Sequence, residues 1–297
     1  MRKYFIQLIP AFLALLFCIC LSTCAPDYPE QVLPTKKIEQ CQTAPIKPEP
    51  VPSKPVPPPP PLADPEIAAD PKILRVGVLL DVPPFIYKKD NKIQGLEADL
   101  AQQLATFVGK TVQFVKVQEK RATEALTEGY VDLIMSGRKI KTSEDCNVIF
   151  SDPYLRGGQI LLVRSRDTAL FSTGIYNLEN SGFTLGVIQG SAGEIFLTKT
   201  IHGVRIMRFQ KVDAAIQALT HKKIDLFLHD APTVCYYAAT AKPAELTPIL
   251  TLVTEEYLGW EMRKDDEKLR QQVNHFIQQS KADGQLQKTI KQWIPNL

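Results

Sequence analysis

The chain has 297 residues, 44% of them hydrophobic, which is enough to bury a sizeable core and allows two domains. Its formal net charge is only +3, and no basic block is interleaved with aromatic residues, so nothing in the sequence predicts nucleic-acid binding. Fifteen of the 23 prolines lie between Pro26 and Pro71, which sets that stretch apart from the rest of the chain.

The N-terminus has the pattern of a secretory signal. Residues 1–3 carry two positive charges, and residues 4–21 form an apolar run. Gln7 and Pro10 interrupt that run, which makes it too short and too broken for a membrane span. We therefore expect residues 1–23 to be a signal peptide and the protein to be exported.

Residues 21–24, Leu-Ser-Thr-Cys, resemble a bacterial lipobox, in which the cysteine becomes the lipidated first residue of the mature protein. This implies lipidation of Cys24, contact with a membrane through the lipid anchor, and a periplasmic or cell-surface location. An ordinary cleaved signal and an uncleaved anchor are the alternatives.

The segment from residue 24 to residue 72 is rich in proline and includes five consecutive prolines at 57–61. Such a segment buries too little apolar surface to offset the entropy lost on ordering, so we predict a stiff, disordered tether. A Pro-rich ligand for another domain is the alternative interpretation.

Strand and helix patterns alternate from Ile73 onward. The helical segment from Glu97 to Val108 has its apolar residues on one face and ends at Gly109. Alternating elements of this length predict a parallel sheet flanked by helices. The expected strands are residues 73–79, 112–117 and 131–135, and the expected helices are residues 97–108 and 121–128.

The same pattern occurs a second time further along the chain. Ala-Leu-Thr at residues 125–127 stands before Val-Asp-Leu at 131–133, and Ala-Leu-Thr at 218–220 stands before Ile-Asp-Leu at 224–226 with the same spacing. The earlier strands also match, since Arg-Val-Gly-Val at 75–78 resembles Thr-Leu-Gly-Val at 184–187. Two similar βα lobes in one chain predict a ligand cleft between them.

The C-terminal region predicts one strand and two helices. The strand covers residues 258–262, and a helix over residues 267–281 follows Asp265 or Asp266, either of which can cap it. A glycine separates that helix from a last one at residues 286–293.

The stretch from Tyr130 to Tyr154 resembles a segment of a known family. A short apolar strand at residues 131–135 is followed by a polar loop, and residues 150–154 are Phe-Ser-Asp-Pro-Tyr. This order is similar to D-L-I-x-x-G-x-x-I-T-x-x-R…F-S-D-P-Y in bacterial extracellular solute-binding proteins of the polar amino-acid type, the soluble receptors of ABC importers. The resemblance covers about residues 73–297.

The resemblance implies an α/β, two-lobed periplasmic-binding-protein-like fold of type II, in which each lobe is a sheet flanked by helices. Lobe 1 would comprise residues 73–163 and the returning residues 252–297, and lobe 2 would comprise residues 164–251. Two crossover strands, near residues 161–164 and 249–254, would form the hinge. In open parallel sheets the ligand lies beyond the carboxyl ends of the strands.

The arginine that holds the ligand carboxylate in amino-acid-binding relatives is absent, because the matching position here is Glu144. A buried acid beside a carboxylate is unfavourable unless one of them is protonated, so an ordinary α-amino acid is not expected to bind in that way. We hypothesise that Lys139 pairs with Glu144 or holds the anion itself. Alternatively, the cations at residues 138, 139 and 141 form a solvated loop surface.

Lobe 1 supplies four further candidate contacts. Ser136 and Gly137 end the apolar strand where the cleft is expected. Phe85 and Glu119 lie near the positions from which relatives cover the ligand with aromatic or apolar residues. Glu119 equally suits a cap for the helix that follows it.

Lobe 2 supplies three more. Ser191 and Ala192 open a helix whose free N–H groups favour an anionic ligand group, and Asp230 matches the family's acidic residue that accepts the ligand ammonium. Helix capping is the alternative role for Ser191 and Asp230. Together, Asp230, Glu144 and Glu119 would make the cleft acidic, which favours a cationic or polyamine-like ligand.

No pattern in the chain indicates catalysis, a cofactor or a metal. The four histidines have no metal-ligand spacing, and no Gly-x-Ser-x-Gly motif is present, so we predict no zinc or other metal, no cofactor and no catalytic residues. A disulfide between Cys146 and Cys235 would join the two lobes and restrain closure, so we expect two buried thiols instead.

The leading interpretation is a tethered monomeric receptor that closes on a small polar solute and presents it to the membrane permease of an ABC importer. A sensory or degenerate binding module without a transport role is the second hypothesis, which the missing arginine favours. The third is a dehydratase-like enzyme on the same fold, in which acidic cleft residues act as acid or base.

Overall fold

The computed structural model describes residues 70–141, 147–240 and 245–297, and these belong to one compact unit. The predicted signal peptide, almost all of the tether, Cys24, Glu144 and Cys146 lie outside the described residues. Among the helices that are described, none is long and apolar enough to cross a membrane.

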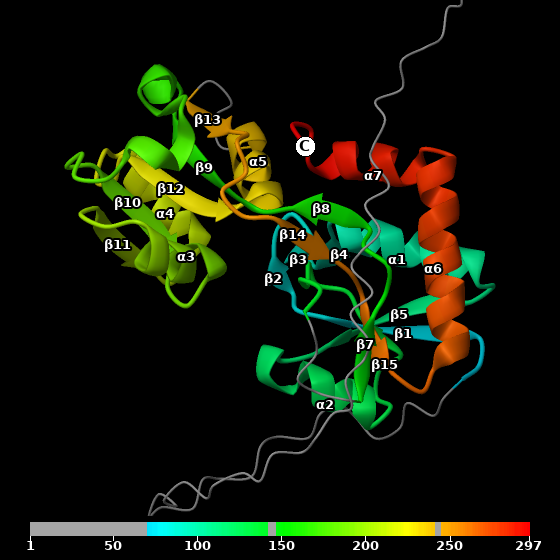
Figure 1. Cartoon of the computed structure of the whole chain (residues 1–297). Helices are drawn as coiled ribbons and strands as arrows, with labels where there is room; N and C mark the ends of the chain where they lie inside the picture. The colour runs from blue at the N-terminus through cyan, green and yellow to red at the C-terminus, as the bar shows by residue number, and fades with distance from the viewer. Residues whose placement is uncertain (1–69, 142–146, 241–244) are drawn as a thin grey trace, which may run out of the picture. The chain divides into compact units, whose positions relative to one another are not determined.

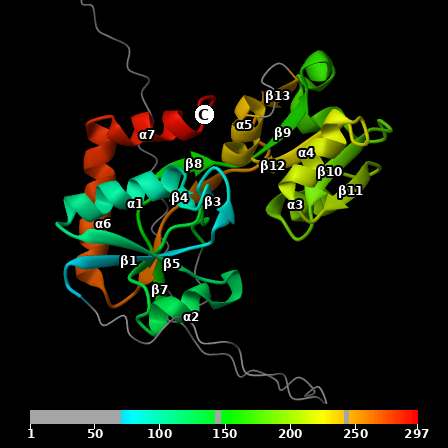
Figure 2. The same ribbon diagram turned by 180° about the vertical axis from the view of Figure 1, so that it is seen from behind.

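The first lobe is built on a five-stranded mixed sheet. Its strands have the order β5 (Thr111–Lys116), β1 (Ile73–Val78), β6 (Leu133–Ile134), β15 (Glu261–Arg263) and β7 (Val148–Phe150), and only the fourth of them, β15, runs antiparallel to the others. A small antiparallel sheet beside it contains β2 (Asp81–Val82), β3 (Ile86–Lys89) and β4 (Lys92–Gln94). The helices of this lobe are α1 (Leu96–Phe107), α2 (Ala122–Thr127), α6 (Glu267–Ala282) and α7 (Gln285–Trp293), with a 3-10 turn at Glu119–Arg121. Helices α6 and α7 belong to the returning C-terminal segment and lie beside α1 in both views (Figures 1 and 2).

The second lobe repeats this arrangement. Its sheet has the order β11 (Arg205–Phe209), β10 (Thr184–Ile188), β12 (Leu226–Asp230), β9 (Gln159–Arg164) and β13 (Leu246–Ile249), and again only the fourth strand, β9, runs antiparallel to the others. Its helices are α3 (Ala192–Thr200), α4 (Val212–Thr220) and α5 (Ala231–Thr240), with 3-10 turns at Ser165–Phe171 and Gly174–Asn177. The two-lobed α/β fold expected from the sequence is therefore confirmed.

The internal repeat read from the sequence corresponds to one structural unit used twice. Asp132 accepts a hydrogen bond from the Arg75 backbone N–H at 2.8 Å, and Asp225 accepts one from the Thr184 N–H at 2.9 Å. In lobe 1 the aspartate before β6 thus binds the backbone of β1, and in lobe 2 the aspartate before β12 binds the backbone of β10. The matched sequence segments are similar because each lobe needs the same buried strand pairing.

Two short strands connect the lobes. Strand β8 (Leu155–Gly157) pairs antiparallel with β14 (Glu256–Leu258), and the pair runs between the two large sheets (Figure 1). The second crossover was expected near residues 249–254, and residues 250–255 are the segment between β13 and β14. The first was expected near residues 161–164, but these residues lie in β9, which is paired on both sides within the sheet of lobe 2. The chain therefore passes between lobes earlier, at Gly157 and Gly158, and the boundary predicted at residue 163 is too late.

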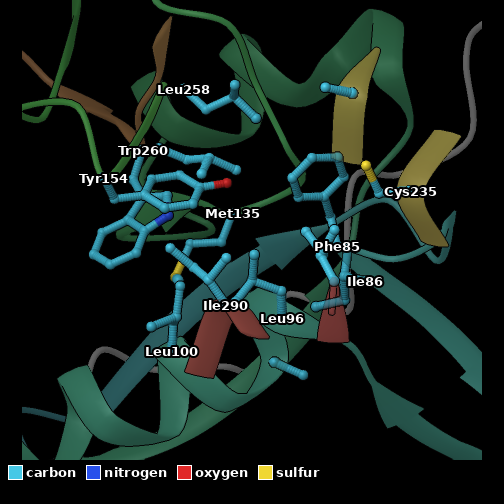
Figure 3. Packing of buried hydrophobic residues seen from close by; sticks show 14 of the residues in the cluster. Phe85, Ile86, Leu96, Leu100, Met135, Tyr154, Cys235, Leu258, Trp260 and Ile290 are labelled. Atoms are coloured by element: carbon cyan, nitrogen blue, oxygen red, sulfur yellow. The ribbon is translucent and has the colours of Figure 1, made fainter. Parts of the chain in front are cut away.

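The expected strand at residues 258–262 is divided. Strand β14 ends at Leu258 in the hinge, and β15 begins at Glu261 in the sheet of lobe 1, with Trp260 between them. The Trp260 side chain is fully buried and stacks on Tyr154 and Phe276, with ring centroids 5.3 and 6.1 Å away. Figure 3 shows the Tyr154 and Trp260 rings together in the buried cluster. A buried aromatic stack therefore lies where the hinge enters lobe 1.

The structure also shows which residue caps α6 and the state of Cys235. Asp266 rather than Asp265 caps α6, because its carboxylate accepts the Leu269 N–H at 3.1 Å. Cys235 is a buried free thiol, as expected, and it lies at the edge of the cluster in Figure 3.

Candidate functional site

A cleft of about 330 Å³ lies between the lobes and is lined from both of them. Lobe 1 and the hinge contribute Asp81, Val82, Pro83, Phe85, Gly137, Lys139, Gly158, Glu256 and Leu258. Lobe 2 contributes Ile188, Gln210, Lys211, Val212, Asp213, His229, Asp230, Pro232, Thr233 and Tyr237. A cavity of this size is in the range of sites for small ligands.

The wall from lobe 1 is fixed by a close contact between Gly137 and Phe85. Gly137 has a φ of 65°, and a Cβ added there would lie 2.7 Å from the Phe85 ring. Only glycine combines this backbone conformation with such a close approach. The Gly137 N–H points inward and donates to Oε2 of Glu97 at 2.5 Å.

Glu97 lies in the first turn of α1 and is fully buried. Its Oε1 accepts hydrogen bonds from the Tyr154 hydroxyl at 2.7 Å and from Trp260 Nε1 at 3.1 Å. Burial raises the pKa of Glu97 to about 7, although the hydrogen bonds from Tyr154, Gly137 and Trp260 and the charge of Arg138 each act to lower it. In the sequence Glu97 resembles an ordinary acidic residue at a helix N-terminus, so local patterns do not indicate its burial.

This raised pKa predicts how stability depends on pH. The folded protein holds a proton on Glu97 up to about pH 7, whereas the unfolded chain releases it near the ordinary value of 4.5, so stability falls as the pH rises through this window. We expect the protein to be more stable at pH 5.5 than at pH 7.5, with a contribution of about 2 kcal/mol from Glu97. Denaturant unfolding followed by circular dichroism at the two pH values measures the difference.

The matched variants for this measurement are Glu97→Gln, which removes the titrating group, and Glu128→Gln, which removes an exposed carboxylate. The contribution should disappear in the first and persist in the second. Asp230 does not interfere, because a group with a lowered pKa contributes a constant amount well above its unfolded value. Equal pH dependence in Glu97→Gln and the parent protein would contradict the assignment.

The wall from lobe 2 centres on Asp230, the last residue of β12. One carboxylate oxygen accepts the Thr233 N–H at 2.9 Å, and the other lies against Nδ1 of His229. Burial acts to raise the pKa of Asp230, but the imidazole of His229 and the hydrogen bonds from Thr233 outweigh it and lower the pKa to about 2. Asp230 therefore presents a partly buried negative charge to the cleft and also caps the start of α5. Its contact with a ligand stays a prediction.

Lys139 reaches the cleft and forms an ion pair with Glu256, with Nζ 2.6 Å from Oε2. Glu256 also accepts hydrogen bonds from Gln159 Nε2 at 3.5 Å and from Thr254 Oγ1 at 3.3 Å. The ion pair thus connects the loop of lobe 1 to Thr254 in the second crossover and to Gln159, the residue that follows the first crossover. Whether Lys139 also contacts Glu144 stays a prediction, since Glu144 lies outside the described residues.

Four of the predicted contacts line the cleft, namely Phe85, Gly137, Lys139 and Asp230. Other predicted residues do not. Ser136 is buried beside Gly137, where its Oγ accepts the Leu79 N–H at 2.9 Å. Glu119 is mostly exposed and lies 3.4 Å from Arg138 in an ion pair outside the cleft.

The helix N-terminus predicted to bind an anion is also outside the lining. The Ser191 hydroxyl accepts the Glu194 N–H at 3.2 Å, so Ser191 is the cap of α3, and Ala192 is the first residue of that helix. The Glu194 carboxylate accepts a hydrogen bond from the Gly190 N–H at 2.6 Å. Both contacts satisfy N–H donors at the start of α3 within the lobe, and the binding of an anion there stays a prediction.

Several charged lining residues were not predicted from the sequence. They are Asp81, Lys211, Asp213, His229 and Glu256. With Lys139 and Asp230, the described lining holds four carboxylates against two amines, so it has an excess of acidic groups. The Tyr237 hydroxyl donates to Asp213 at 2.6 Å on this surface. No local signal marks these residues, because exposed charges are common throughout the chain.

Known proteins resemble this chain over the two-lobed part. A probable histidine-binding protein from Neisseria gonorrhoeae is 26% identical over 234 residues, which cover 76% of this chain and 85% of the relative. A cyclohexadienyl dehydratase from Pseudomonas aeruginosa is 28% identical over 160 residues, which cover 54% of this chain and 59% of the enzyme. The solved structure of an ancestral cationic amino acid solute-binding protein is 29% identical, with a TM-score of 0.68, and covers 75% of this chain and 96% of that one.

The comparison with protein families gives a match to residues 74–296. This range contains both sheets, the hinge strands and every residue that lines the cleft. Because the match spans nearly all of the described residues, the chain belongs to the bacterial extracellular solute-binding proteins, family 3.

Proposed function

We propose that the protein is an exported, lipid-anchored receptor that closes its two lobes on a cationic amino-acid-like or amine solute and presents it to the permease of an ABC importer. The observation that carries the choice of ligand is the acidic cleft, in which Asp230 offers a partly buried carboxylate. A charge-assisted hydrogen bond to an ammonium or guanidinium group suits such a carboxylate. The cationic amino acid specificity named for one solved relative supports the same class.

Lys139 and Glu256 have a proposed role at the other end of the ligand. Lys139 is the cation of the lobe 1 loop that lines the cleft, and Glu256 holds it at 2.6 Å. If the ligand carries a carboxylate, Lys139 offers the charge that an arginine supplies in relatives with the usual pattern. Glu144 would then orient the Lys139 amine or repel the carboxylate of the ligand.

The test is isothermal titration calorimetry on the purified protein with L-arginine, L-lysine, putrescine and L-glutamate. We expect the three cationic probes to bind and L-glutamate to bind at least about tenfold more weakly, because an anionic side chain meets excess carboxylates. Small-angle scattering with and without L-arginine should show a more compact bound form. Tight binding of L-glutamate alone would contradict the proposed ligand class.

The lipid anchor is a separate part of the proposal. Mass spectrometry of the mature N-terminal peptide should find a lipid-modified Cys24, and an unmodified cysteine there would remove the anchor. The alternative of a degenerate module, favoured by Glu144 at the arginine position, predicts no compaction with any probe. We propose no catalytic activity, and the enzyme among the relatives matches little more than half of this chain.

A further inference from the structure

Glu97 connects the two parts of lobe 1 that face the cleft. Its side chain accepts the Gly137 N–H at 2.5 Å, and its backbone N–H donates to the Phe85 carbonyl oxygen at 2.8 Å. Gly137 and Phe85 both line the cleft, whereas Glu97 is fully buried behind them. Glu97 therefore binds both Gly137 and Phe85, the two residues that are in close contact in this wall.

The same carboxyl group also holds the ends of the hinge. Tyr154 immediately precedes β8, and Trp260 lies two residues after β14. Both donate to Oε1 of Glu97, at 2.7 and 3.1 Å. Since β8 and β14 are the paired strands between the lobes, Glu97 lies where both of them enter lobe 1.

We propose that Glu97 is a positioning residue for ligand binding: its ionised carboxylate fixes the Gly137 peptide and the lobe 1 ends of both hinge strands, so ligand affinity follows its protonation. The effect on affinity rests on the proposed binding function. The effect on the hydrogen-bond cluster itself does not depend on it.

The chemistry of the cluster gives the direction of the effect. The carboxylate faces three donors, namely the Gly137 N–H, the Tyr154 O–H and the Trp260 N–H. A protonated carboxyl brings a fourth hydrogen into this cluster, and only the Tyr154 hydroxyl can turn to accept it. The Gly137 N–H then donates to a neutral group, and a neutral acceptor holds it about half as strongly as a charged one. Burial raises the pKa of Glu97 to about 7, so this change falls near neutral pH.

Other charged groups lie near the cluster. Arg138 acts on Glu97 through its charge and is itself paired with Glu261, with Nε 2.7 Å from Oε2. Asp230 acts on Tyr154 from lobe 2, and its pKa of about 2 keeps it ionised across the neutral range. His229 lies against Asp230 in the cleft wall, so a His229 variant serves as a control for the pH dependence.

Tryptophan fluorescence tests the cluster without any ligand. The chain has two tryptophans, and Trp293→Phe leaves Trp260 as the single reporter. We expect its emission to change with a midpoint near pH 7, and we expect Glu97→Gln to abolish this transition. Tyr154→Phe keeps the carboxyl group but removes one donor to its charged form, so it should move the midpoint to higher pH. A transition that survives Glu97→Gln unchanged would overturn the proposal.

Calorimetric titration with L-arginine tests the effect on affinity. In the parent protein we expect the Kd to be about three- to tenfold weaker at pH 5.5 than at pH 8, which corresponds to the weakening of one charge-assisted hydrogen bond. Glu97→Gln should make the profile flat, and His229→Gln should retain the part near pH 7. The same pH profile in the parent protein and in Glu97→Gln would overturn the role in binding.

The outcomes separate this inference from the proposed function. If neither L-arginine nor the other cationic probes bind at any pH, the proposed ligand class fails, while the fluorescence titration still reports on the Glu97 cluster. If L-arginine binds but Glu97→Gln changes neither the fluorescence transition nor the pH profile, the positioning role fails and the receptor function stands.

Discussion

Replacing Asp230 with asparagine is expected to weaken L-arginine and L-lysine binding by about 100-fold or more. The substitution removes the partly buried negative charge that faces the cleft, and truncating one partner of a charge pair that the bound ligand buries costs about 2–5 kcal/mol. Asparagine keeps an oxygen that can accept the Thr233 N–H, so the start of α5 and the fold should remain. Calorimetric Kd values for the parent protein and the variant give the comparison.

Asp265→Asn is the matched control, because it removes the same charge from an exposed position next to α6. It should change the Kd by less than about twofold, since a solvent-exposed charge outside the cleft is largely screened. An Asp230→Asn protein that still binds L-arginine as the parent does would remove Asp230 from the site. A comparable loss in both variants would show that the effect is one of overall charge.

The second large effect is expected for Gly158→Ala at the first crossover. A Cβ at Gly158 would lie 1.8 Å from the Thr254 carbonyl oxygen, which belongs to the second crossover. The two segments are also joined by hydrogen bonds from Gln159 N–H to Thr254 Oγ1 at 3.0 Å and from Val253 N–H to the Gln159 carbonyl at 2.8 Å. Because backbone atoms cannot yield as a flexible side chain does, we expect a loss of about 3 kcal/mol in the free energy of unfolding.

Gly157→Ala provides the neighbouring control. Its added Cβ would find its nearest atoms at 3.8 and 3.9 Å, which is ordinary van der Waals contact. Urea unfolding of the two variants should therefore separate them clearly, with Gly157→Ala within about 1 kcal/mol of the parent protein. Equal stability of Gly158→Ala and the parent would mean that the crossovers separate more easily than this geometry implies.

The carboxyl groups of Asp230 and Glu97 have pKa shifts in opposite directions. Asp230 is stabilised as an anion by His229 and Thr233, which lowers its pKa to about 2. Glu97 has three donors but lies deeper, and burial outweighs them to raise its pKa to about 7. Ionisation of Glu97 thus lowers the stability of the fold above pH 5, while the ionised carboxylate fixes the position of the cleft wall.

The sequence by itself determined most of the helices and long strands that it predicted, the repeated lobe and the family. Helix periodicity, caps and strand spacing are local, and they indicated α1, α6 and α7 closely. The aspartates of the repeat, Asp132 and Asp225, stood at equal spacing because each lobe buries the same strand pairing. The resemblance to the family also singled out Asp230, which follows a buried strand and lines the cleft.

Only the tertiary structure decided the position of the hinge and the partners of the charged groups. The apolar residues 160–163 suit a buried strand in either lobe, so the sequence could not assign β9 to one of them. The Glu97 carboxyl group receives donors 40, 57 and 163 residues away, and Lys139 finds Glu256 in the hinge. Such contacts leave no local periodicity, because they form only when folding brings distant segments to the same buried point. The cleft depends on these contacts between distant segments.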